Sequence, residues 1–146
     1  MRKPLAVGVA TLAVALGLAA CGGSDDSDAL SNADLIAQAD AICADYDEQL
    51  TTITDEAALD ENSSKAEVAQ FVSDEIVPLY QDQVDELGAL EPNEDDADAY
   101  NDIVDTLDSE VQAVADDPEA AIDQDNPFAG ATAKAQEFGL EECGAE

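Results

Sequence analysis

Apolar residues recur at steps of three and four positions through most of the chain after Ala29. This spacing is typical of amphipathic helices, and no window alternates as a half-buried strand would. The pattern predicts a first long helix over about residues 32–54, preceded by a capping-box pattern at Ser31 and Asp34. We therefore expect an all-α fold for residues 31–146.

A second long helix is predicted to start with the capping-box pair Ser64 and Glu67 and to end near residues 88–90. Pro78 lies inside it, and a proline there removes one backbone hydrogen bond and bends the helix. The alternative is two helices, with Pro78 at the first position of the second. The kinked helix is the preferred interpretation because Val77 would be a poor N-cap.

The third long helix is expected to be capped by Asn93, with three acidic residues in its first turn. A short helical turn follows over residues 117–122, and a last helix is expected to start at Asn126-Pro127 and to end before Gly139. The predicted fold is thus a small helical bundle of three long helices plus one or two short C-terminal helices.

The first twenty residues have a different pattern. Arg2 and Lys3 precede an apolar run over residues 5–18, which is shorter than the roughly 20 residues of a permanent membrane-spanning helix. A basic start, a short apolar middle and small residues at the end are typical of a secretory signal peptide. Residues 1–20 are therefore predicted to be a signal peptide.

The end of this segment, Leu18-Ala19-Ala20-Cys21, resembles the lipobox of bacterial lipoproteins. The resemblance implies that Cys21 receives a diacylglycerol and becomes the first residue of the mature chain. Two or more acyl chains anchor a protein stably, so the expected location is the extracytoplasmic face of the cell membrane. The Gly-, Ser- and Asp-rich residues 21–30 are predicted to form a flexible acidic tether.

Once Cys21 carries lipid, Cys43 and Cys143 remain as an even pair. Such a pair in an oxidising compartment usually forms a disulfide, and closing a loop of about 100 residues contributes up to about 4.7 kcal/mol by loop entropy. A metal site is the competing interpretation, but two thiols without histidine make a poor one. The Cys-bearing first helix and the terminal Phe-Gly-Leu-x-x-Cys resemble small actinobacterial lipoproteins, a likeness that implies no activity.

The chain has 36 acidic and 4 basic residues and no histidine. Removal of Arg2 and Lys3 with the signal leaves Lys65 and Lys134, so the mature net charge is about −34. Such a surface repels nucleic acid and anionic lipid and attracts cations or a basic protein partner. The acidic stretches do not follow the EF-hand pattern, and no metal site or cofactor is predicted.

The absence of histidine removes the commonest general base, and both remaining cysteines are expected to be oxidised. We therefore expect no enzyme but a non-enzymatic binding or envelope-interaction domain. The alternative is a carrier of a small ligand or cation, such as a metal, haem or lipid. Tyr46, Tyr80 and Tyr100 are the candidate ligand-binding residues, although Tyr46 and Tyr100 lie on apolar stripes where tyrosine ordinarily packs in the core.

The lipobox makes a direct prediction for Cys21, whose thiol is the acceptor of the lipid. Cys21→Ser should abolish lipid attachment and leave the precursor unprocessed or released. Metabolic labelling with a fatty-acid analogue measures this, with the wild-type chain as reference. Undiminished label on the serine variant would contradict the lipoprotein interpretation.

Overall fold

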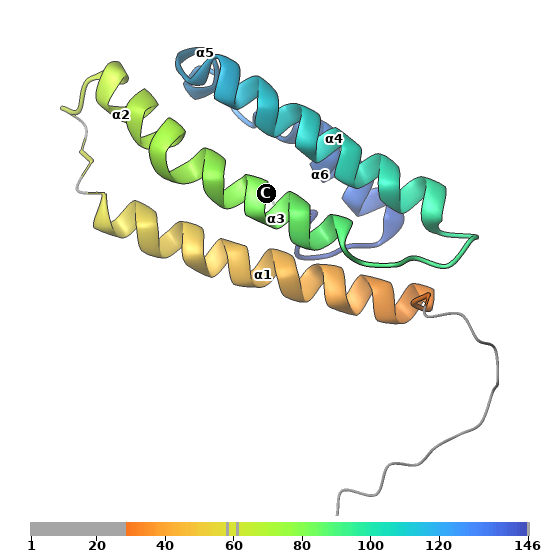
Figure 1. Ribbon diagram of the computed structural model, residues 1–146. Helices are drawn as coiled ribbons and strands as arrows, with labels where there is room; N and C mark the ends of the chain where they lie inside the picture. Colours follow the sequence, from red (N-terminus) through yellow and green to blue (C-terminus); the bar gives the residue numbers. More distant parts are fainter. Residues whose placement is uncertain (1–28, 58, 61, 146) are drawn as a thin grey trace, which may run out of the picture.

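The computed structural model describes residues 29–57, 59–60 and 62–145, and these form a helical bundle, as predicted (Figure 1). The predicted signal peptide, Cys21 and most of the predicted tether lie outside the described residues. Within the described ranges the only β-type pairing is an isolated bridge between Leu30 and Pro92. None of the described helices combines the length and the apolar character that crossing a membrane requires.

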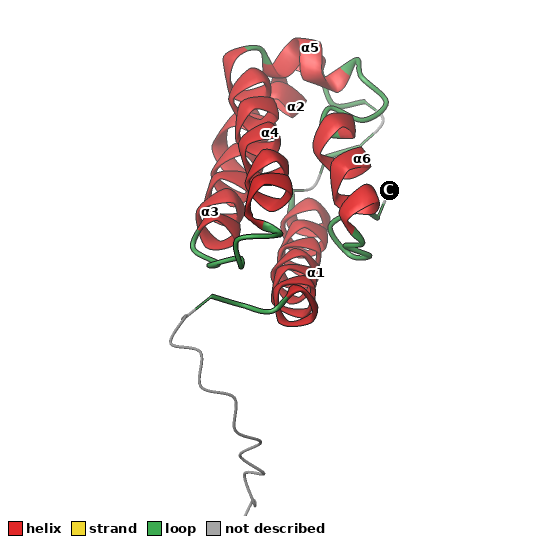
Figure 2. Cartoon of the chain, turned by 90° about the vertical axis from the view of Figure 1, so that its right-hand side faces the viewer, coloured by secondary structure: helices red, strands yellow, loops and turns green. Residues whose placement is uncertain are grey.

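Four helices surround the core, and two short ones lie together at one end (Figure 2). The four are α1 (Asn32–Glu56), α3 (Val77–Gly88), α4 (Ala97–Asp116) and α6 (Ala129–Phe138). The short helices are α2 (Lys65–Phe71) and α5 (Pro118–Ile122), which contact each other. α4 packs against both α3 and α6, whereas α1 packs mainly along α3.

Both predicted capping boxes lie at the starts of helices. The Ser31 side chain accepts a hydrogen bond from the Asp34 amide, at 3.3 Å. At the start of α2 the box is reciprocal: the Ser64 hydroxyl accepts from the Glu67 amide, and the Glu67 carboxylate accepts from the Ser64 amide at 2.8 Å. The Ser31 cap is one-way and satisfies one amide, whereas the complete box at Ser64 satisfies two, and each fixes where its helix begins.

The chain stays helical through Pro78, as the kinked-helix interpretation expected. α2 passes into a π-helical segment, η1 (Val72–Ile76), and then directly into α3. At the junction the Val77 amide donates to the Val72 carbonyl, five residues back. The wider turn is suited to this position, because the ring of Pro78 would crowd the carbonyl four residues before it in a regular α-helix.

The predicted start of the third long helix is wrong by a few residues. α4 begins at Ala97, and Asn93 caps the preceding turn: its Oδ1 accepts from the amides of Asp95 and Asp96, at 3.0 and 3.2 Å. Asn93 Nδ2 also donates to the Leu30 carbonyl at 3.2 Å. The asparagine therefore joins the turn to the segment that enters α1, a contact between distant residues that local sequence cannot reveal.

The start of the last helix also differs from the prediction. Pro127 precedes the helix, and α6 begins at Ala129 because Phe128, with φ −111° and ψ 21°, is not helical. Its end is as predicted: Gly139 has φ 101°, a conformation that favours glycine and terminates the helix.

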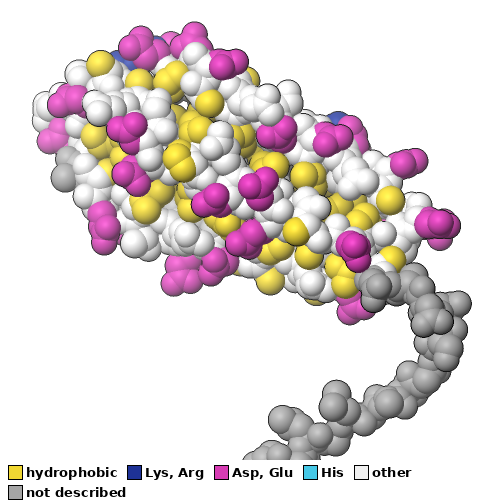
Figure 3. Space-filling view, viewed as in Figure 1, with side chains coloured by type: hydrophobic (Ala, Val, Ile, Leu, Met, Phe, Trp, Pro, Cys, Tyr) yellow, Lys and Arg dark blue, Asp and Glu magenta, His cyan; other side chains and the backbone are white. Residues whose placement is uncertain are grey.

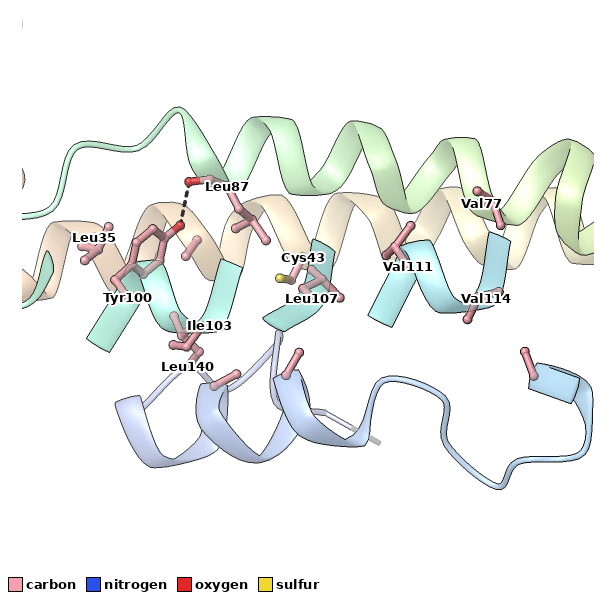
Figure 4. Close-up of a cluster of buried hydrophobic side chains, with 14 residues drawn as sticks. Leu35, Cys43, Val77, Leu87, Tyr100, Ile103, Leu107, Val111, Val114 and Leu140 are labelled. Atoms are coloured by element: carbon pink, nitrogen blue, oxygen red, sulfur yellow. Dashed lines mark hydrogen bonds between the residues drawn. The ribbon is translucent and has the colours of Figure 1, made fainter. Parts of the chain in front are cut away.

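The core lies between the four main helices (Figure 4). Leu35 of α1 and Tyr100 and Val111 of α4 are its largest fully buried side chains. All of the described core residues fall between Leu35 and Leu140. A chain beginning at Gly22 therefore contains all of the described core residues.

The C-terminal tail is fastened to α1 by a covalent bond and by a carboxylate. Cys43 and Cys143 form the predicted disulfide, with their Cα atoms 5.1 Å apart. Asp40, one turn earlier on α1, accepts hydrogen bonds from the amides of residues 141, 142 and 143, at 3.2, 3.0 and 3.4 Å. The tail thus returns to α1, as the cysteine pairing required.

The disulfide makes a stability prediction. Replacing both Cys43 and Cys143 with alanine should destabilise the domain by about 2–4 kcal/mol, because the unfolded chain regains the entropy of a long loop. The melting temperature should fall by several degrees while most helical circular dichroism remains. The parent chain from Gly22 should show no reactive thiol under denaturing, non-reducing conditions. Two thiols per chain would contradict both the bond and this topology.

Candidate functional site

A cavity of about 500 Å³ lies between α1, α3, α4 and α6. Its position follows from the packing, since α1 and α6 are not among the helix pairs in close contact, and the tail with Cys143 bridges them instead. The volume is within the roughly 300–1,000 Å³ that small-molecule sites usually have. This cavity is the candidate functional site.

The floor of the cavity is apolar. It is built from buried side chains of all four helices and of the tail: Cys43, Leu87, Tyr100, Ile103, Leu107, Ala131, Ala135 and Leu140. The two alanines keep α6 from filling the space with side chains. An apolar floor with small residues on one wall is suited to an apolar group of a ligand.

Gln83 is the buried polar residue in this floor. It is 6 % exposed and lines the cavity from α3. Its Nε2 donates to Sγ of Cys43 at 3.4 Å, which is a weak interaction because a disulfide sulfur is a poor acceptor. Among the described residues no group donates a hydrogen bond to its side-chain oxygen. In the described part of the chain no buried side-chain nitrogen or oxygen lacks a hydrogen-bond partner, so this oxygen is accessible from the cavity, where water or a ligand group can donate to it.

The three candidate tyrosines have different positions. Tyr80 and Tyr100 line the cavity, whereas Tyr46 is buried elsewhere on α1 and is not part of the lining. The Tyr100 hydroxyl donates to the Leu87 carbonyl at 2.9 Å, shown by the dashed line in Figure 4. Tyr100 is therefore already engaged in holding α4 against the end of α3.

The surroundings of Tyr46 and Tyr100 favour the neutral phenol. Burial raises the pKa of Tyr100 to about 12. Burial, followed by the nearby carboxylate of Glu86, raises the pKa of Tyr46 to about 12 as well. Tyrosine binds iron best as the phenolate, and both environments favour the neutral phenol.

Tyr80 forms an aromatic pair at the edge of the cavity. Its ring lies 4.4 Å from that of Phe128, centroid to centroid, and both rings line the cavity. Burial, and then the negative charge of Asp47, raises the pKa of Tyr80. Asp47 is thus close enough to this pair for its charge to act on the phenol.

The mouth of the cavity is acidic. Asp47 on α1, Asp125 on the loop before α6 and Glu142 on the tail line the cavity and are exposed. We call these three residues the rim carboxylates. They come from the segments on either side of the space between α1 and α6, so the cavity opens there. Burial raises the pKa of Asp47, which means that its charge is partly removed from water without a compensating cation.

The lysines of the described segments are engaged elsewhere. Lys65 forms an ion pair with Asp123, at 2.8 Å, and Lys134 with Asp102, at 2.6 Å. On the face shown in Figure 3, carboxylates are spread over the surface and hydrophobic side chains are visible between them. The rim carboxylates therefore gain no neutralising partner from the described part of the chain. That part also contains no group of three or more carboxylate or cysteine side chains placed to hold a metal ion.

Glu110 holds the wall of the cavity that α6 provides. Its two carboxylate oxygens accept hydrogen bonds from the amides of Gly130 and Ala131, at 2.9 and 3.0 Å. These amides belong to the first turn of α6, where a negative charge is favourable. A β-carbon at position 130 would lie 2.5 Å from Oε1 of Glu110, so a larger residue there would require the Glu110 side chain to shift. The cap comes from another helix and could not be found from local sequence.

Neither a protein-family model, nor a characterised protein, nor a solved structure matches the chain.

The cap of α6 makes a prediction for Glu110. Glu110→Ala should destabilise the domain by about 1–2 kcal/mol, because two helix-terminal amides lose their acceptor. Thermal or urea unfolding measures this. Asp105→Ala, which removes an exposed carboxylate from the same helix, is the control and should change stability much less. Equal effects of the two substitutions would show that charge, and not the cap, is responsible.

Proposed function

We propose that this protein is a lipid-anchored, extracytoplasmic, non-enzymatic binding protein whose helical bundle takes up a small ligand with a largely apolar body. The observation that carries the proposal is the cavity of about 500 Å³ with its apolar floor. The lipobox resemblance at Cys21 supports the anchoring. A bundle anchored in this way would lie at a membrane surface, where apolar and amphipathic molecules are concentrated.

The chemistry of the lining supports binding more than catalysis. The chain has no histidine, and Cys43 and Cys143 are joined to each other and so cannot act as thiolate nucleophiles. The rim carboxylates are exposed, whereas acid–base catalysis by paired carboxylates needs environments that set their pKa values well apart. The space between α1 and α6 supplies an entrance to a cavity that a ligand can fill.

Binding of a neutral probe tests the proposal. The soluble chain from Gly22, shown to be folded by circular dichroism, should bind the neutral dye N-phenyl-1-naphthylamine saturably, with one dye per chain and enhanced fluorescence. Ala135→Leu and Thr132→Leu add side-chain volume at two lining positions and should each weaken binding about tenfold, equivalent to about 1.4 kcal/mol.

Ala133→Leu is the matched control, because Ala133 is exposed on the same helix and does not line the cavity. It should leave dye binding unchanged. Two cavity-filling variants, Ala135→Leu and Thr132→Leu, are used so that misfolding of one of them does not decide the result. A folded parent chain without saturable binding would contradict the proposed function, as would equal affinities of the lining and control variants.

A further inference from the structure

We infer that the ligand of this cavity is an organic amine cation, with its apolar body on the cavity floor and its protonated amine between Gln83, the Tyr80–Phe128 pair and Asp47. This inference rests on the proposed function, which provides the cavity, and adds the chemical class of the ligand. Three independent features of the lining support it.

The first feature is the spare acceptor of Gln83. This amide is buried to more than nine-tenths and has only a disulfide sulfur as a partner for its Nε2. Its oxygen is an acceptor, so the ligand group that completes it must be a donor. A protonated amine carries such donors and no acceptor. A carboxylate or phosphate could accept only from the second hydrogen of Nε2 and would leave this oxygen without a donor.

The second feature is the aromatic pair one helical turn from Gln83. Tyr80 lies three residues before Gln83 on α3, so both side chains project to the same side of that helix. The Tyr80 and Phe128 rings, 4.4 Å apart, form part of the lining. Aromatic faces attract ammonium groups through their quadrupole, and the attraction is strongest where water is excluded.

The third feature is the position of Asp47. It lies four residues after Cys43 on α1, one turn from the sulfur that Gln83 contacts. It lines the cavity and its charge reaches Tyr80. Neither lysine of the described ranges is its partner, since both are paired with Asp123 and Asp102. A cationic ligand therefore supplies the neutralising charge that this carboxylate lacks, while Asp125 and Glu142 keep anions from the mouth.

Three ligands with one chain and different head groups test the inference. Decylammonium and decanesulfonate, kept below the concentrations at which they form micelles, and decanol, kept below its solubility limit, are titrated against the dye-loaded chain from Gly22. The buffer contains about 0.15 M sodium chloride, which screens charges beyond about 8 Å and so suppresses attraction by the overall net charge. Decylammonium should displace the dye at about a tenfold lower concentration than decanol, and decanesulfonate should be the weakest.

Substitutions separate the site from the acidic surface. Asp47→Asn and Gln83→Met should each reduce the preference for decylammonium over decanol about three- to tenfold while leaving decanol binding within about twofold. Asp105→Asn removes the same charge outside the lining and should change neither affinity. Asp47 is exposed, so its variant keeps the test decisive if Gln83→Met fails to fold.

The outcomes distinguish the two proposals. Equal binding of decylammonium and decanol, or an equal effect of Asp47→Asn and Asp105→Asn, would overturn the amine assignment and leave the apolar cavity as the binding site. Dye binding that no decyl compound displaces would likewise overturn the amine assignment. Failure of the folded parent chain to bind the dye or any decyl compound would overturn the proposed function itself.

Discussion

The fold depends on how its last residues are attached to its first helix. α1 packs along α3, and α6 packs on α4, but α1 and α6 are not in close contact. The disulfide between Cys43 and Cys143 and the three amides bound by Asp40 close the bundle on this side. A link of this kind holds two helices together at a distance, whereas direct packing would bring them into contact. The central cavity exists because the C-terminal tail, and not direct packing of α1 on α6, closes the bundle.

The same attachment organises the mouth of the cavity. Cys143 fixes the tail, and Glu142 beside it lines the cavity together with Asp47 of α1. The two lysines of the described part sit in ion pairs elsewhere, so the acidic mouth has no internal counter-charge. A strongly negative net charge is ordinarily a matter of solubility and self-repulsion. Here the positions of the carboxylates around the cavity mouth bear on the charge that a ligand should carry, whereas the total net charge does not.

Much of the architecture could be predicted from local sequence, because capping and helical periodicity are local effects. The Ser31 and Ser64 caps, the helix through Pro78 and the Gly139 terminus all depend on residues within a few positions of one another. The disulfide could be predicted because only two cysteines remain once Cys21 is set aside. The start of α6 could not be predicted from local sequence, because the residue that caps it, Glu110, belongs to another helix.

The cavity was beyond sequence reasoning for a similar physical reason. Residue type alone suggests Tyr46, Tyr80 and Tyr100 as candidates; Tyr80 and Tyr100 line the cavity, and Tyr46 does not. Gln83 and Asp47 cannot be identified from the sequence, because nothing among its many polar residues marks the ones that face an interior space. Gln83 did carry one usable signal: it lies four residues before Leu87 and three after Tyr80, on the buried side of its helix.

The π-helical segment before Pro78 also sets the angular position of the residues that follow it. Each residue of an α-helix advances the side-chain direction by about 100°, and a π turn accommodates one residue more than an α turn. The helical run can therefore direct α2 towards α5 and still direct α3 towards α1 and α4. If residues 72–76 formed a regular α turn instead, α3 would be rotated by about a quarter turn relative to α2. Gln83 and Leu87 would then leave the interior, although every residue of the run would still be helical.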